Sequence, residues 1–290
     1  MKRTLAIAIA CLFAVAATAL AELHGSWTAN TIETKPGRVQ MNISSGGSHN
    51  FGNSMNVADF TGLSDAQIRG AAQVPVQFQL LREGGTISFE GSFKNGDGAG
   101  QWTFAANRGY IASLRSLGVK FDLDGDSEEE NLFTVALLDV STAYIRSMQA
   151  IGYDESLEKY LSFRIFKVTP ELVAELRELG FDHLSADELV STRVHKVTPE
   201  LIRKMRSEGF TSLTLDELMS FRIHKVTSEF IAELGDLGYD HLTADQLVSM
   251  RIFKVTPQYI RDLKDAGYSG IPVQKLIDMK IHKIDLTRPR

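Results

Sequence analysis

A ten-residue segment that occurs four times constrains the fold of this 290-residue chain more than any other feature. Each copy lies 29 residues from the next, and a slightly shorter unit opens at Val140. The copies read RIFKVTPELV (164–173), RVHKVTPELI (193–202), RIHKVTSEFI (222–231) and RIFKVTPQYI (251–260). Such a period is typical of an array in which each unit stacks on the next. The spacing predicts five full repeats over 140–283, followed by a C-terminal tail over 284–290.

Each unit carries the start and stop signals of two short helices. A Thr before Pro or Ser fits an N-cap, and a Gly about eleven residues later fits the C′ position that ends the helix. A Ser or Thr three residues before Glu or Gln then predicts a second helix start, a capping box. The caps are Thr169, Thr198, Thr227 and Thr256, the glycines are Gly180, Gly209, Gly238 and Gly267, and the boxes are Ser185 with Glu188, Thr214 with Glu217 and Thr243 with Gln246.

Helices of about ten residues are marginal alone, so their apolar faces must be buried between units. In the second helix of one unit, Leu189, Val190 and Val194 are expected to form that face. We therefore predict an α-solenoid of 29-residue two-helix repeats.

The N-terminal part follows a different pattern. Residues 22–105 are rich in Gly, Asn, Ser and Thr, and apolar and polar residues alternate in them as in strands. VPVQFQLL (74–81) and TISFEGSF (86–93) flank a Gly-bearing turn, which indicates a β-hairpin. We predict a small antiparallel β domain of roughly five strands, sandwich-like or a half-barrel. Residues 106–139 are interpreted as a degenerate helical repeat with an acidic insertion, so the predicted fold class is α+β.

The first 21 residues are interpreted as a cleaved signal peptide. Lys2 and Arg3 precede an apolar run, and Ala19-Leu20-Ala21 fits the small-residue cleavage rule. The expected location is periplasmic or secreted. Cys11, the one cysteine, would leave with the signal, so the mature chain would have no disulfide. No later apolar stretch approaches the roughly 20 residues of a membrane span.

Cleavage would remove two cations from a chain whose formal charge is already −5. A negative balance disfavours nucleic acid as a partner, because the phosphate backbone attracts a basic face.

Two basic positions recur in phase at the predicted end of the second helix. One interpretation is internal, because cations there offset the helix dipole and can pair with carboxylates such as Asp187, Asp216 or Asp245. The other is a basic stripe that binds an acidic partner or an anionic surface; the net-acidic composition favours internal pairing. The positions are Arg164, Arg193, Arg222, Arg251 and Lys280, and, three residues on, Lys167, Lys196, Lys225, Lys254 and Lys283.

Between these two cations one position alternates between His and Phe. It holds Phe166, His195, His224, Phe253 and His282. A metal or acid–base role requires a ligating or titrating group, which Phe does not have. We therefore predict a flat ring packed at the joint between repeats.

The acidic insertion DLDGDSEEE (122–130) is similar to half of an EF-hand loop. Asp122, Asp124 and Asp126 occupy its first, third and fifth positions, but Ser127 replaces the Gly and Phe133 the Glu that complete the loop. The two interpretations are a weak calcium site and a solvated acidic insertion, and the incomplete ligand set favours the second.

No catalytic pattern is present. The chain has no His-Glu-x-x-His, no Gly-x-Ser-x-Gly and no paired cysteine. We predict a non-enzymatic protein without a cofactor.

Units such as LGFDHLSADELVSTRVHKVTPELI resemble repeats of bacterial envelope proteins. They are similar to the extracytoplasmic C-terminal extensions of some sensor metallopeptidases of the BlaR1-like M56 family, and the segment VQFQLLREGGTISFEGSFKNGDGAGQWTFAANRGYI (76–111) resembles the part that precedes those repeats. The resemblance covers most of 74–283. It implies an exported sensing or interaction region; proteolysis is not carried over, because this chain lacks the zinc motif and the peptidase part.

Three functions remain open. The first is an interaction or scaffold protein whose array binds a protein or peptide. The second is a ligand-binding sensor whose β domain holds a small molecule or glycan. Its pocket would be lined by Trp27, Phe78, Phe89, Trp102 and Phe104, unless these alternate between core and surface. The third is a structural or stress-protective envelope protein with no specific ligand.

Overall fold

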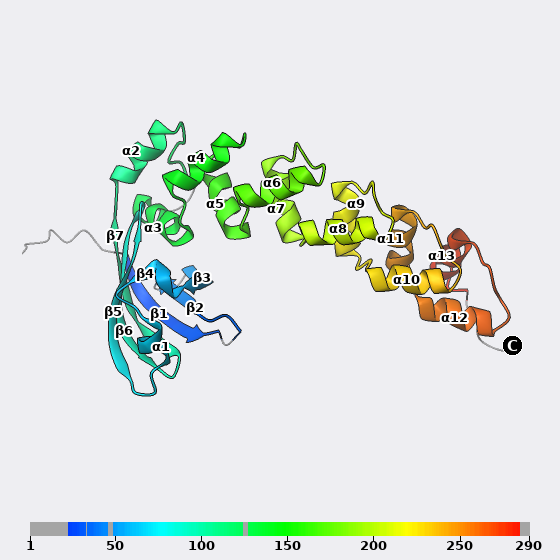
Figure 1. The fold of residues 1–290 in the computed structure, drawn as a ribbon, viewed down its shortest axis with the longest axis horizontal. Helices are drawn as coiled ribbons and strands as arrows, with labels where there is room; N and C mark the ends of the chain where they lie inside the picture. The colour runs from blue at the N-terminus through cyan, green and yellow to red at the C-terminus, as the bar shows by residue number, and fades with distance from the viewer. Residues whose placement is uncertain (1–22, 33, 46–48, 124–126, 285–290) are drawn as a thin grey trace, which may run out of the picture. The chain divides into compact units, whose positions relative to one another are not determined.

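The computed structural model describes residues 23–32, 34–45, 49–123 and 127–284, which form two compact units (Figure 1). One unit contains the described residues up to Ser113 with those of Leu123–Ser141, and the other contains Leu114–Asp122 with the described residues from Thr142 onward. An antiparallel sheet followed by helices in tandem confirms the predicted α+β class and the two-helix repeats. The predicted signal peptide, 1–21, lies outside the described residues.

The first unit is built on one curled, fully antiparallel sheet in the order β3-β2-β1-β7-β6-β5-β4. The strands are β1 (Leu23–Thr31), β2 (Arg38–Ser45), β3 (His49–Asn56), β4 (Phe60–Thr61), β5 (Val74–Arg82), β6 (Gly85–Lys94) and β7 (Asp97–Ala106), with η1 (Val57–Asp59) before β4. The described residues thus form seven strands rather than about five. The additional strands carry little sequence signal. In β3 the residues HNFGNSMN do not alternate between apolar and polar, and β4 has two residues.

One face of the sheet carries the aromatic core. Trp27 contacts Phe78 edge to face at 5.4 Å between ring centroids, and Phe78 stacks on Phe89 at 4.8 Å. The indole N–H of Trp27 donates to the carbonyl oxygens of Glu90 and Gln101, so burial leaves no polar ring atom unpaired there. Gly100 makes the approach of β6 and β7 possible, because a Cβ there would lie 1.9 Å from the Glu90 oxygen.

Two helices cover this face at opposite ends of β6 and β7. The short α1 (Asp65–Arg69) lies at the β6–β7 turn, where Gly96 N–H donates to the Ile68 carbonyl. At the other end α3 (Glu128–Leu138) stacks Phe133 on Trp102 at 4.4 Å. The helix interpreted as the second half of the degenerate repeat is therefore part of the sheet's core. Its partner helix in that repeat is α2 (Gly109–Ser116).

The second unit is a tandem array of helix pairs. Its helices are α4 (Thr142–Ala150), α5 (Leu157–Phe166), α6 (Pro170–Glu178), α7 (Ala186–Val194), α8 (Pro199–Ser207), α9 (Leu215–Ile223), α10 (Ser228–Asp236), α11 (Ala244–Ile252), α12 (Pro257–Asp265) and α13 (Val273–Ile281). Odd-numbered helices contact odd-numbered neighbours (α5 with α7, α9 with α11, α11 with α13), and α6 with α8 and α10 with α12 do the same. The array is therefore two layers thick (Figure 1).

The predicted start and stop signals of the repeat helices are confirmed. Thr169, Thr198, Thr227 and Thr256 accept a hydrogen bond from the backbone N–H three residues on. The three predicted capping boxes form, and the four glycines adopt φ of 80° to 97° just beyond their helices.

The buried face of the second helix differs from the prediction. Leu189 and Thr192 are fully buried, whereas Val194 is 49% exposed. The inward residues are three apart, so Val194 points away, and the Thr192 hydroxyl is accommodated because it donates to the Leu189 carbonyl at 2.7 Å. Apolar type alone did not identify the packed face.

Candidate interaction surface

Each of the five full repeats ends its second helix in the same left-handed turn, and a lysine occupies it; in the degenerate repeat Asp139 has the equivalent position at the end of α3, with φ of 54°. Lys167, Lys196, Lys225, Lys254 and Lys283 have φ of 53° to 56° and exposed side chains. The next residue closes the turn; in one repeat the Val197 N–H donates to the Thr192 carbonyl at 2.7 Å. This is the Schellman geometry, whose left-handed position normally holds Gly because a Cβ is unfavourable there.

We call the two phased basic positions the basic ladder: Arg164, Arg193, Arg222, Arg251 and Lys280 form its first rung, and Lys167, Lys196, Lys225, Lys254 and Lys283 its second. Three arginines of the first rung bind the backbone of the preceding repeat. Arg193 Nε donates to the Phe166 carbonyl at 2.9 Å, and the same bond joins Arg222 to His195 (3.3 Å) and Arg251 to His224 (3.2 Å). Each arginine thereby ties its own repeat to the end of the preceding second helix. The internal interpretation holds for these three residues, but with a backbone carbonyl in place of the expected carboxylates.

The other members of this rung lie over aromatic rings. The Arg164 guanidinium is 5.0 Å from the Tyr144 ring centroid, and Lys280 Nζ is 3.5 Å from that of Tyr259. Arg251 combines its carbonyl bond with a ring contact, at 4.6 Å from Phe230. Each ring belongs to the first helix of the same repeat, so the cation also fastens the helix pair.

A carbonyl acceptor explains why His and Phe alternate. Every residue supplies a carbonyl, so the arginine does not restrict the side chain beside it. The rings are less packed than predicted: Phe166 is 36% and Phe253 39% exposed. They reach the surface because they sit at the last turn of the helix, beyond the residues that face the neighbouring repeat.

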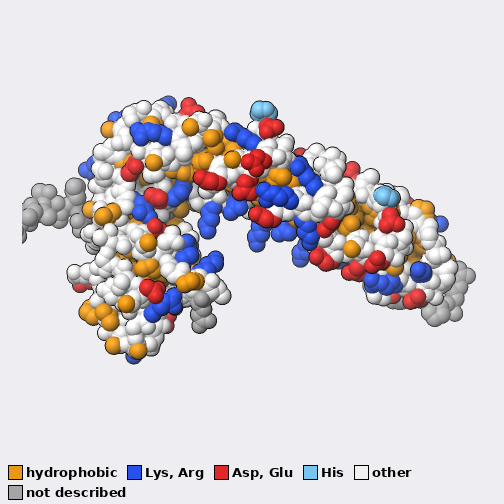
Figure 2. All heavy atoms as spheres, in the orientation of Figure 1, with side chains coloured by type: hydrophobic (Ala, Val, Ile, Leu, Met, Phe, Trp, Pro, Cys, Tyr) orange, Lys and Arg blue, Asp and Glu red, His pale blue; other side chains and the backbone are white. Residues whose placement is uncertain are grey.

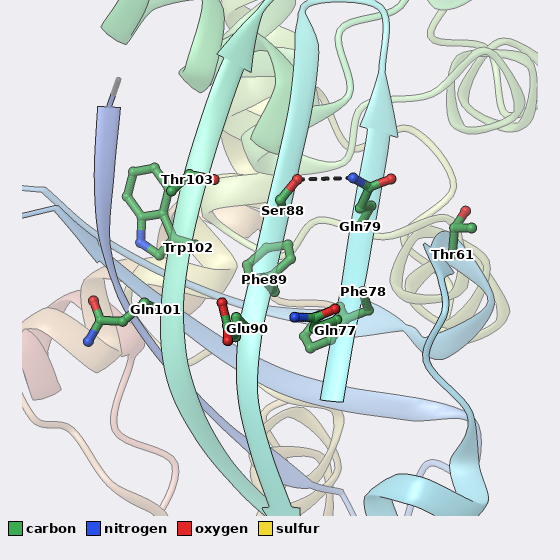
Figure 3. A pocket seen from close by; sticks show the side chains of 10 residues that line it. All are labelled: Thr61, Gln77, Phe78, Gln79, Ser88, Phe89, Glu90, Gln101, Trp102 and Thr103. Carbon is green, nitrogen blue, oxygen red and sulfur yellow. Dashed lines mark hydrogen bonds between the residues drawn. The ribbon is translucent and has the colours of Figure 1, made fainter. Parts of the chain in front are cut away.

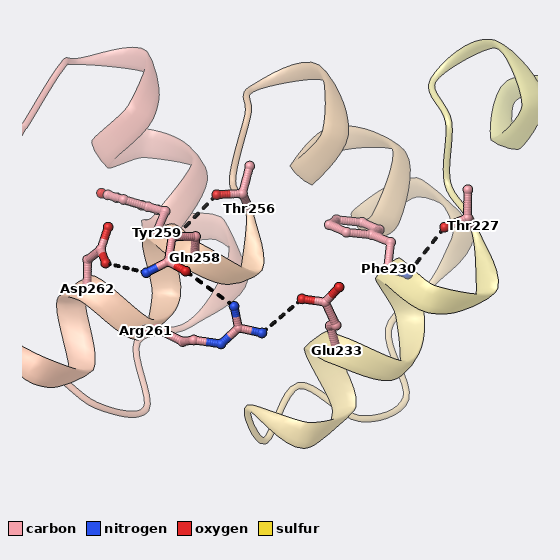
Figure 4. A network of polar contacts seen from close by, with 8 residues as sticks. All are labelled: Thr227, Phe230, Glu233, Thr256, Gln258, Tyr259, Arg261 and Asp262. Atoms are coloured by element: carbon pink, nitrogen blue, oxygen red, sulfur yellow. Dashed lines mark hydrogen bonds and ion pairs between the residues drawn. The ribbon is translucent and has the colours of Figure 1, made fainter.

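The carboxylates near the joints bind other cations. Asp187 pairs with Lys159, and on the first helices Arg203 pairs with Glu175 (3.4 Å) and Arg261 with Glu233 (2.8 Å; Figure 4). Across the described parts of the chain, no ion pair involves Lys167, Lys196, Lys225, Lys254 or Lys283. The two rungs of the ladder therefore differ: the first is engaged internally and the second faces solvent.

An exposed aliphatic residue precedes each ring. Ile165, Val194, Ile223, Ile252 and Ile281 are 47–54% exposed. We call the aliphatic residue, the ring and the lysine the helix-end triplet; the triplets are 165–167, 194–196, 223–225, 252–254 and 281–283. Figure 2 shows basic and hydrophobic side chains at the surface of the array. The carbonyl bonds from the arginines connect one triplet to the next repeat, so the triplets follow one another along the odd-numbered helices.

The β unit offers a different surface. The five aromatic residues considered as pocket lining, Trp27, Phe78, Phe89, Trp102 and Phe104, are at most 2% exposed and belong to the core. A concavity of about 410 Å³ does exist across β4 to β7, lined mainly by exposed polar side chains such as Gln77, Glu90 and Gln101 (Figure 3). Two of its residues are joined by a hydrogen bond, which Gln79 Nε2 donates to Ser88 Oγ at 3.1 Å.

The acidic insertion gives no built metal site among the described residues. Asp122 is exposed, whereas Asp124 and Asp126 lie outside the described part of the chain. No group of three or more His, Cys, Asp or Glu side chains within 23–32, 34–45, 49–123 and 127–284 is arranged to hold a metal ion. The calcium hypothesis thus falls mostly on residues that the structure does not describe.

Across the same ranges, no helix has the length and apolar character needed to cross a membrane. Comparison of the chain with protein-family models, curated proteins and solved structures finds no match.

Proposed function

We propose that this chain is an exported, non-enzymatic interaction protein that binds a protein or peptide through the helix-end triplets, in the bacterial envelope and in a sensing role. One observation supports this most directly: each repeat exposes a large aliphatic side chain next to a lysine that has no ion pair among the described residues. Repeated exposed apolar residues rimmed by charge are typical of interaction surfaces rather than of an inert solvated face.

Site-specific photo-crosslinking in the native envelope tests the proposal. A photoreactive phenylalanine replaces Phe166 or Phe253, and the control carries it at Leu81, which is 51% exposed on β5 and lies far from the triplets in sequence. We expect both triplet positions to crosslink one and the same protein, which then binds the purified chain directly. Equal crosslinking at all three positions, or none, would contradict the proposal. Release of a product that begins at Glu22 would test export.

The polar concavity supports a second candidate, a β unit that binds a glycan or other neutral polar ligand. Side-chain amides and hydroxyls dominate its lining, and these groups donate and accept hydrogen bonds as sugar hydroxyls do. Glycan fragments should raise the melting temperature of the intact chain, and the change Gln101→Ala should reduce that shift. If no fragment shifts the melting temperature of the unaltered chain, this candidate fails.

A further inference from the structure

We infer that the triplets recognise an extended, acidic polypeptide with a carboxylate at every third or fourth residue. This inference rests on the proposed function and deepens it by naming the partner's chemistry. It follows from three properties of the triplets: the sign of their free charge, their arrangement in a row, and the apolar residue beside each lysine.

The free charge is positive. Each turn-closing N–H and, in three repeats, the arginine of the next unit occupy carbonyls at the helix end, so the backbone there is already bonded. The exposed lysine amino groups are left to bind an external anion. A carboxylate is the matching acceptor on a polypeptide, because charge-assisted bonds are stronger than neutral ones.

The arrangement is a row rather than a patch. The triplets lie at equivalent ends of odd-numbered helices; α5 contacts α7, α9 contacts α11 and α11 contacts α13, and the bond from Arg222 to the His195 carbonyl links α9 to the end of α7. Packed helix axes are about 10 Å apart, and an extended chain advances about 3.3 Å per residue, so neighbouring lysines meet residues about three apart. A single row fits an extended chain, whereas anionic membranes attract clusters of cations on one broad surface.

The aliphatic residues add an apolar requirement. Val194, Ile223 and Ile252 are each about half exposed, two residues before the lysine. A partner that placed only charges along the row would leave these side chains in water. We therefore expect small or aliphatic residues between the carboxylates, which bury this surface and supply the non-electrostatic part of the affinity.

Fluorescence anisotropy with designed peptides tests the inference on the chain from Glu22 onward. The probe is a fifteen-residue peptide of five Glu-Val-Ser units, and a second peptide has the same composition with its glutamates adjacent. We expect the periodic peptide to bind at least about fivefold more tightly, since the contacts at three or more lysines require the spacing. Equal affinity for the two peptides would overturn the periodicity.

A matched set of variants tests the lysines. The triple change Lys196→Asn, Lys225→Asn and Lys254→Asn removes three charges while keeping a residue that tolerates the left-handed turn. The control replaces exposed Lys94, Lys120 and Lys264 by Asn, for the same change in charge. The triplet variant should lose at least about tenfold in affinity and the control less than about twofold. Unchanged circular dichroism for both variants shows that they fold.

Other outcomes identify other occupants and overturn the inference. If phosphatidylglycerol vesicles bind in a lysine-dependent manner and the peptide does not, the ligand is an anionic surface. If the triplet variant instead abolishes self-association measured by sedimentation, the occupant is a second copy of the chain. If crosslinking at Phe166 and Phe253 captures a protein that lacks spaced acidic residues, the proposed function stands and the partner chemistry is wrong.

Discussion

Each of the five full repeats ends its two helices in the same type of left-handed turn, with Gly at the first end and Lys at the second. The first helix ends at Gly209 or its equivalents, and the Phe210 N–H closes the turn on the Met205 carbonyl at 3.0 Å. The second ends at Lys225 or its equivalents, where the Val226 N–H closes a turn of the same hydrogen-bond pattern on the Phe221 carbonyl at 2.8 Å, with φ of 56° at Lys225 against 97° at Gly209. The left-handed residue is unstrained at the first end and unfavourable at the second.

The difference teaches that the two ends have different tasks. At the first end the residue serves the turn, and Gly is the stable solution. At the second end the fold accepts an unfavourable residue in every repeat, next to an exposed aliphatic side chain. Gly would remove the conformational cost at this position, whereas lysine adds a cation at the helix end and an exposed amino group, which is the group that the proposed binding would use. Four comparisons, from the largest expected effect to the smallest, break or sharpen this distinction.

The inward and outward residues of one helix end should differ most. Phe221 is buried against Phe210 (ring centroids 5.7 Å apart), so Phe221→Ala should cost about 3–5 kcal/mol. Ile223 lies two residues on and is 54% exposed, so Ile223→Ala should lower the free energy of unfolding by less than about 0.5 kcal/mol. Hydrogen exchange of the amides of α9 and α10 measures both. A large cost at Ile223 would show that the aliphatic residue serves the fold.

The two left-handed positions should respond in opposite directions. A Cβ at Gly209 would meet no atom within 4 Å, so the cost of Gly209→Ala is conformational, about 1–2 kcal/mol. Lys225→Gly should be neutral or stabilise by up to about 1 kcal/mol, because relief of the turn is offset by a more flexible unfolded chain and a lost helix-end cation. Urea unfolding compares them; a clear loss at Lys225→Gly would mean that its side chain stabilises the fold.

Removal of an arginine should loosen the joint between two repeats. Arg251→Ala loses the bond to the His224 carbonyl and the contact with the Phe230 ring, together about 1–2 kcal/mol. Arg261→Ala is the control, since it breaks only exposed contacts, the ion pair with Glu233 and a long hydrogen bond to Gln258 (3.5 Å), and should cost under about 1 kcal/mol. Local hydrogen exchange should rise on both sides of the joint for Arg251 alone. Equal effects would show that the carbonyl bond adds nothing.

The smallest expected effect is the change in the stability of α7 as the pH falls. Hydrogen bonds from the Ser185 backbone and hydroxyl hold the pKa of Glu188 below its usual value. A lowered folded-state pKa gives stability that is present above the unfolded pKa, about 4.3 for Glu, and is lost as pH falls through the lower folded-state pKa. Gln246 makes the equivalent bond without titrating. Glu188→Gln should therefore remove the acid sensitivity of α7 relative to α11 in pH-dependent exchange; an unchanged profile would contradict this.

The helices were predictable because their signals are local. The Thr caps, the capping boxes and the glycines act within four residues of sequence. Their recurrence with the repeat therefore predicts the ten helices of the array, α4 to α13. In the β unit the same logic found the β5–β6 hairpin. It missed β3, because its polar sequence is placed by pairing with β2 rather than by its own alternation.

The site was less predictable because its contacts join a side chain to the backbone rather than one side chain to another. Arg193 bonds to a backbone carbonyl 27 residues away, and a carbonyl has no sequence signature. Val194 is exposed because the buried residues of its helix, Leu189 and Thr192, are three apart. Thr192 is polar, so a search for apolar residues does not find this spacing. The sequence did identify the two cationic positions, but only the structure separates their roles.

The joint made by a side chain and a backbone carbonyl has a consequence for how such arrays change length. Because the arginine requires no particular partner residue, a duplicated or deleted unit meets its new neighbour with the fastening already in place. Interfaces built from matched side chains would need compensating substitutions at each new junction. We therefore expect this joint to tolerate the gain or loss of a whole repeat more readily than the side-chain pairs between first helices, such as Arg203 with Glu175, which need both partners.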